Sequence, residues 1–140
     1  LDARLEVLAT IDEWLVDVDG VRAVIAAADP WHGGTWCHLD LHGNNVLTAE
    51  GRLAAIIDWG DAGQGDPATD LGQAWYLLGS ERFQTFTDAY SEAGGVADIS
   101  APRVRAEALA YAVTMATLDD EVYAASGWKS LEDLGVATRN

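Results

Sequence analysis

The sequence has little positive charge. Its 140 residues include eight Lys and Arg against 23 Asp and Glu, which gives a formal net charge of −15 at pH 7. A protein that binds nucleic acid needs a basic surface for the phosphate backbone, so we expect no nucleic-acid partner. The acid excess favours cationic partners, but it also keeps a surface soluble, and both explanations stay open.

Cysteine and long apolar runs are equally scarce. Cys37 is the single cysteine, which excludes an intrachain disulfide, and we expect it to be buried and unreactive. No apolar run approaches the ~20 residues that a membrane-spanning helix needs, and the first residues do not form a signal peptide. We therefore predict a cytoplasmic protein with no membrane partner. Because the chain begins with Leu1 rather than Met, we expect it to be part of a longer protein.

The residues that are present suffice for a folded domain. A hydrophobic fraction of 49% with six tryptophans is typical of a globular chain, and the length predicts one domain over residues 1–140. Helical spacing of apolar residues predicts helices over residues 1–17, 20–28 and 81–92, and one long helix from 101 past 122. Asp66-Pro67 is typical of a helix start, with a capping acid and a proline in the first turn.

The middle of the chain has a different pattern. Residues 46–48 and 53–57 predict two short strands joined by a turn over 49–52. The predicted fold is therefore mainly α with one short β-hairpin.

Polar residues frame this hairpin. Asp40 and Asn45 precede the first strand, and Asp58 directly follows the second. Because antiparallel strands return to where they began, we expect Asn45 and Asp58 to lie side by side. An amide oxygen and a carboxylate suit Mg²⁺, and Asp40 nearby is suited to orient a hydroxyl and accept its proton. These residues together predict phosphoryl transfer.

Three motifs resemble one known family. The segment HLDLHGNNVL over residues 38–47 is similar to the catalytic loop of aminoglycoside phosphotransferases, usually written HGDLHPGNVL. IIDW over 56–59 looks like the family's metal-binding segment, and GDPATDL over 65–71 matches its GDPxxDLA signature. The resemblance covers about residues 36–78. It implies the C-terminal catalytic lobe of a protein-kinase-like fold.

The resemblance also implies roles for individual residues. Asp40 would be the catalytic aspartate, Asn45 a Mg²⁺ ligand, and Asp58 the main Mg²⁺ ligand that bridges the phosphates of ATP. Asp70 would brace the catalytic loop by accepting hydrogen bonds from its N–H groups. The implied reaction is transfer of phosphate from ATP to a hydroxyl of a small molecule, with aminoglycosides and related antibiotics among the candidate acceptors.

The chain departs from the family pattern at three loop positions. Leu39 and Asn44 each stand where glycine is usual, and Gly43 stands where proline is usual. Glycine and asparagine both tolerate a turn, and none of the three changes replaces a reacting group.

The parts that hold ATP in such kinases are missing. No glycine-rich hairpin precedes Trp36, and the single lysine, Lys129, lies near the wrong end. We therefore expect the nucleotide-binding lobe to lie outside this chain, and the chain alone to be inactive and to self-associate through the face left open. An inactive kinase-like binding module and a metal-dependent hydrolase are the alternative functions.

Other polar residues have structural explanations. His38 is expected to pack or hydrogen-bond under the loop, and Asp66 to cap a helix. The three histidines raise the question of zinc, but one cysteine and many acids favour a hard metal. The run of acids over 119–121 is either a solvated helix face or a contact for a cationic acceptor.

Overall fold

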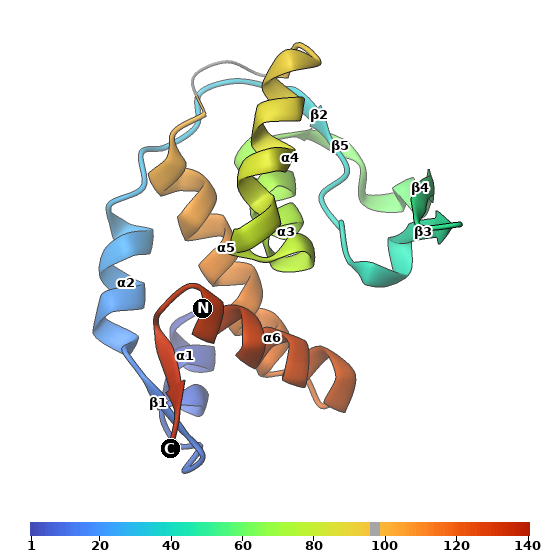
Figure 1. Ribbon diagram of the computed structural model, residues 1–140. Helices are drawn as coiled ribbons and strands as arrows, with labels where there is room; N and C mark the ends of the chain where they lie inside the picture. Colours follow the sequence, from blue (N-terminus) through green and yellow to red (C-terminus); the bar gives the residue numbers. More distant parts are fainter. Residues whose placement is uncertain (96–98) are drawn as a thin grey trace.

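The computed structural model describes residues 1–95 and 99–140, which form six α-helices and six short strands (Figure 1). The helices are α1 (Asp2–Leu8), α2 (Val18–Ala26), α3 (Pro67–Leu78), α4 (Ser80–Glu92), α5 (Ala101–Ala116) and α6 (Glu121–Asp133). The strands are β1 (Trp14–Val16), β2 (Thr35–Cys37), β3 (Val46–Ala49), β4 (Arg52–Ile56), β5 (Gly63–Gly65) and β6 (Ala137–Arg139). They pair antiparallel as β1 with β6, β2 with β5 and β3 with β4. None of the helices described is long and apolar enough to cross a membrane.

Helix α5 lies at the centre of the helical part. It packs against α1, α2, α3 and α6 (Figure 1). Its Leu109, Ala112 and Val113 are completely buried, and full burial of one leucine side chain stabilises the fold by roughly 1.5–3 kcal/mol. The core that surrounds them includes Leu5, Leu8, Val21, Leu131, Leu134, Val136 and Ala137.

Two glycines let other helices approach α5 closely. A Cβ atom placed on Gly72 of α3 would lie 2.6 Å from the backbone nitrogen of Ala108 in α5. A Cβ atom on Gly127 of α6 would meet the backbone nitrogen of Ala116. Backbone atoms cannot move aside as the end of a flexible side chain can, so both crossings require glycine.

The predicted start of α3 is confirmed. The Asp66 carboxylate accepts a hydrogen bond from Ala68 N at 2.9 Å, and Pro67 occupies the first turn. The buried Arg103 of α5 also donates to this carboxylate. One side chain therefore caps α3 and ties it to α5.

The predicted hairpin and the helices near 20–28 and 81–92 are also confirmed. The turn of the hairpin, between β3 and β4, places Glu50 at φ 53° and Gly51 at φ 72°. Positive φ at both central residues is the geometry of the tightest hairpin turns, which match the twist of the strands they join. At the right edge of Figure 1 the hairpin projects away from the helices.

The prediction of a helix over residues 1–17 is wrong. Helix α1 ends at Leu8, and Trp14–Val16 forms a strand with Ala137–Arg139. Leu15, one of the apolar residues whose spacing predicts that helix, is 62% exposed. Of these residues, Leu5 and Leu8 pack in the core, whereas residues 14–16 pair with a strand at the end of the chain.

The prediction of one long helix past residue 122 is also wrong. Helix α5 ends at Ala116, and α6 begins after Asp120, whose carboxylate accepts hydrogen bonds from Val122 N at 2.9 Å and Tyr123 N at 3.1 Å. An aspartate at this position favours a helix start over helix continuation, because its oxygen satisfies the free N–H groups of the first turn. Val122, whose spacing from the earlier apolar residues predicts that the helix continues with a core-facing side chain, is 77% exposed.

The α3–α5 crossing gives a prediction for stability. Gly72→Ala should lower the free energy of unfolding by about 1–3 kcal/mol, because the two helices must separate to admit a methyl group. Gly43→Ala is the control, since the nearest atom to its new Cβ would be Leu77 Cδ2 at 3.9 Å. Urea unfolding followed by circular dichroism measures both variants, and equal stabilities would contradict the close crossing.

Candidate active site

Asp70 of α3 holds the start of the loop that carries Asp40. Its two carboxylate oxygens accept hydrogen bonds from His38 N at 2.7 Å and Leu39 N at 2.8 Å. Hydrogen bonds to an ionised acceptor are stronger than neutral ones. The prediction that Asp70 braces the loop is confirmed.

Gln73 holds the same loop and was not singled out from the sequence. This residue, only 4% exposed, accepts a hydrogen bond from Leu41 N at 2.7 Å and donates one to Leu39 O at 3.1 Å. It lies one helical turn after Asp70, so both side chains project from the same face of α3. A glutamine on the face already assigned to loop bracing is the signal that could have identified it.

Leu39 has a left-handed backbone, with φ 68°. Such a conformation costs a residue with a side chain about 1–3 kcal/mol, and it explains why glycine is usual here in the family pattern. The side chain of Leu39 lies over β5: Leu39 Cδ2 would be 3.1 Å from a Cβ atom on Gly65. Leucine at this position is thus accommodated because β5 presents glycine to it.

His38 lies beneath the loop, as predicted. Its Nδ1 accepts a hydrogen bond from Asp40 N at 3.3 Å, which leaves Nε2 to donate to Ile57 O at 2.9 Å. The ring also packs edge-on against Trp59, with 4.7 Å between ring centroids. His38 therefore joins the loop that carries Asp40 to the segment that carries Asp58, and both of its ring nitrogens take part in these hydrogen bonds.

Asp40 and Asn45 are in direct contact. Asn45 Nδ2 donates to Asp40 O at 2.9 Å and lies 3.3 Å from Asp40 Oδ2. Asn45 is buried, whereas the side chain of Asp40 is 38% exposed and open to a ligand. His42 stands close by, with Nε2 at 3.4 Å from Asp40 Oδ2.

The hairpin brings the backbone of Asp58 next to Asn45. Val46 pairs with Ile56, and Ile57 N donates to Asn45 O at 2.9 Å, so Asp58 is one residue beyond this bond. Asp58 has a left-handed backbone at φ 60°, another strained conformation of the kind that clusters at functional sites. Its carboxylate is exposed and has no hydrogen bond or ion pair with the residues described.

The free oxygen atoms at this site fit a hard cation. The amide nitrogen of Asn45 contacts Asp40 and His42 in the loop. The amide oxygen of Asn45, Oδ1, makes no hydrogen bond with the described part of the chain. Mg²⁺ is bound by few protein oxygens and keeps several waters or phosphate oxygens. Among residues 1–95 and 99–140 there is no group of three or more His, Cys, Asp or Glu side chains arranged for a metal. Asn45 and Asp58 would therefore form an open, two-residue site.

Tyrosines from α5 and α6 lie near the loop. Burial raises the pKa of the Tyr111 phenol, and the negative charge of Asp40 raises it further. Tyr123 accepts a hydrogen bond from Asn44 Nδ2. The neighbouring Asp120 is used as a helix cap.

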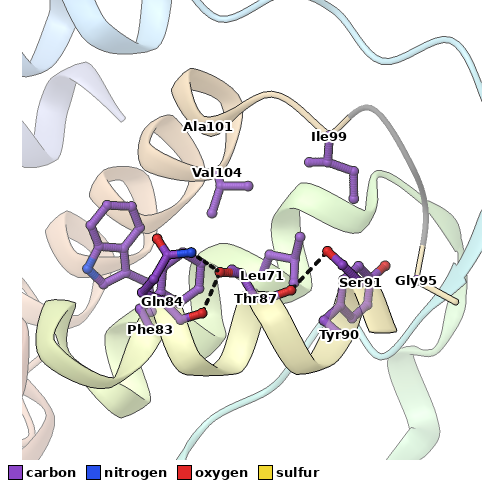
Figure 2. A pocket seen from close by; sticks show the side chains of 11 residues that line it. Leu71, Phe83, Gln84, Thr87, Tyr90, Ser91, Gly95, Ile99, Ala101 and Val104 are labelled. Atoms are coloured by element: carbon purple, nitrogen blue, oxygen red, sulfur yellow. Dashed lines mark hydrogen bonds between the residues drawn. The ribbon is translucent and has the colours of Figure 1, made fainter. Parts of the chain in front are cut away.

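A cavity lies away from Asp40, Asn45 and Asp58. It has a volume of about 480 Å³ between α3, α4 and the start of α5, and Figure 2 shows Leu71, Phe83 and Val104 among its lining side chains. Asp40, Asn45 and Asp58 do not line it. The candidate chemistry is thus on the open surface of the loop and not in this cavity.

The sequence of the chain is similar to that of known proteins. The model of the phosphotransferase enzyme family matches residues 2–108. The chain is similar to hygromycin-B 4-O-kinase of Escherichia coli, at 32% identity over 74 residues that cover 49% of this chain and 20% of that protein. The chain therefore matches only about a fifth of the length of this relative. No solved structure matches it. Since the family model spans more than half of the chain and includes the loop, the hairpin and most of α3 to α5, the chain belongs to the phosphotransferase enzyme family.

Proposed function

We propose that residues 1–140 are one domain, the catalytic lobe of an ATP-dependent kinase that phosphorylates a hydroxyl of a small molecule. The observation that supports this most strongly is the contact between Asp40 and Asn45 on a loop braced from α3. Phosphoryl transfer needs little covalent chemistry from the protein and depends on positioning and charge neutralisation. A rigid loop with one open carboxylate meets the first of these needs.

Each residue has a role in this reaction. Asp40 accepts the proton of the acceptor hydroxyl. At the same time the hydroxyl oxygen forms a bond to the terminal phosphorus of ATP, and the bond between that phosphorus and the oxygen of ADP breaks. Asn45 and Asp58 would hold Mg²⁺, which when bound would neutralise the charge of the phosphates. The glycine-rich loop and lysine that cover ATP in such kinases would come from the remainder of the protein.

The similarity to hygromycin-B 4-O-kinase makes an antibiotic hydroxyl one candidate acceptor. Aminoglycoside antibiotics are cationic. The net charge of −15 on this chain would favour their approach through long-range attraction. Antibiotic resistance would follow from that activity.

Asp40→Asn should abolish most of the phosphoryl transfer by the protein that carries this chain. The expected loss in kcat is about 10²- to 10⁴-fold, because a general base and its positioning are removed together. Asp88→Asn on α4, an exposed acid outside the site, is the control. Retention of a tenth of the activity would refute the assignment of Asp40. Phosphate release that does not require an acceptor would favour the hydrolase.

The metal site has a separate test. Asp58→Asn should raise the Mg²⁺ concentration for half-maximal activity by about tenfold, equivalent to ~1.4 kcal/mol of binding free energy, because a charged ligand becomes neutral. Asp61→Asn changes an exposed acid in the same segment and should leave the Mg²⁺ dependence unchanged. If both variants titrate like the wild type, the metal is bound elsewhere.

Exposed apolar side chains predict self-association of the isolated chain. Trp36 is 74% and Leu53 63% exposed, and Leu47, Ile57 and Trp59 near them in sequence are also exposed. In the whole protein we propose that the nucleotide-binding lobe covers these side chains. Sedimentation of residues 1–140 at about 100 µM, a concentration that detects weak association, should show dimers that Trp36→Ser with Leu53→Ser removes. Leu15→Ser with Val122→Ser, which changes exposed residues elsewhere, is the control, and dimers that survive the first pair would contradict the prediction.

A further inference from the structure

Gln73 contacts both peptide groups that adjoin Asp40. The carbonyl of Leu39 belongs to the peptide before Asp40, and it accepts from Gln73 Nε2 at 3.1 Å. The N–H of Leu41 belongs to the peptide after Asp40, and it donates to Gln73 Oε1 at 2.7 Å. The orientation of these two planes sets the φ and ψ of Asp40, and therefore the direction in which its side chain leaves the backbone.

The peptide before Asp40 needs such support. Leu39 is held at φ 68°, a conformation that a residue with a side chain avoids unless its surroundings impose it. The N–H of Leu39 donates a hydrogen bond to Asp70. Among the residues described, only Gln73 donates a hydrogen bond to the carbonyl of Leu39. Relaxation of Leu39 would rotate the peptide plane shared with Asp40.

The chemistry of the amide suits this task better than that of a carboxylate. One amide both donates and accepts, so a single orientation of Gln73 satisfies a carbonyl and an N–H at once. A glutamate here would accept from Leu41 but place negative charge against the Leu39 carbonyl. The side chain is 4% exposed, so water cannot replace a lost partner cheaply.

We propose that Gln73 is a positioning residue, which holds Leu39 in its left-handed conformation and thereby fixes the direction of Asp40. Its effect on rate rests on the proposed function. The restraint on the backbone of Leu39 does not, and it can be measured without any reaction.

The test is a double-mutant cycle in the protein that carries this chain. Gln73→Met removes both hydrogen bonds at similar side-chain size, and Leu39→Gly removes the conformational cost, because glycine adopts positive φ freely. Gln73→Met should lower kcat by about 10- to 100-fold through misplacement of Asp40, with the KM for the acceptor changed by less than about threefold. In the Leu39→Gly background, the fold-loss of kcat caused by Gln73→Met should be smaller by at least about threefold. Gln84→Met, the same change at an exposed glutamine of α4, should leave kcat within about twofold.

Melting temperatures of the same variants complete the experiment. Gln73→Met should lower Tm less in the Leu39→Gly background than in the wild type, and this comparison stands even if no phosphoryl transfer is found, in which case only the proposed function fails. Equal losses of kcat and of Tm in both backgrounds would overturn the inference, as would an unchanged kcat in Gln73→Met. Should Gln73→Met not fold, Gln73→Glu takes its place, because it keeps the bond to Leu41 and loses the one to Leu39.

Discussion

A polar loop without secondary structure cannot fix its own conformation, and in this chain the loop from His38 to Leu41 depends on hydrogen bonds from helix α3. Asp70 and Gln73 supply them, two each. Helix α3 is in turn fixed by its close crossing with α5 at Gly72 and by the contact of Arg103 with Asp66. The position of Asp40 is therefore set by packing between helices in addition to the hydrogen bonds that its own backbone makes with His38 and Asn45. Sites built on rigid elements in this way are more precise than sites built on loops alone.

The side chains of the site divide into those that support and those that remain open. His38 uses both ring nitrogens on backbone groups, and Asn45 uses its amide nitrogen on Asp40. The carboxylate of Asp58 and the amide oxygen of Asn45 make no hydrogen bond with the residues described, and the carboxylate of Asp40 is partly exposed although its Oδ2 lies near Asn45 and His42. Such a division suits a reaction in which oriented charge contributes more than covalent chemistry.

The sequence predicted the local features of this arrangement better than the long-range ones. The hairpin, the cap at Asp66 and the bracing by Asp70 follow from turn chemistry, capping and a family motif, each contained in a short segment. The pairing of β1 with β6 joins three-residue strands at opposite ends of the chain, too short for their alternation to be distinctive. The break between α5 and α6 was missed because the apolar spacing continues through it, while one carboxylate at Asp120 decides where a helix begins. Gln73 was missed because it belongs to none of the three motifs, although it lies one helical turn after Asp70 on the face that meets the loop.

The seating of Leu39 over Gly65 has a consequence for how this family can change in evolution. A side chain at position 65 and a leucine at position 39 compete for the same space, with 3.1 Å between Leu39 Cδ2 and the nearest added atom. Leucine at position 39 therefore favours glycine at position 65, whereas glycine at position 39 would leave this space open. The effect of a substitution at either position should therefore depend on the residue at the other, although the two positions belong to different motifs.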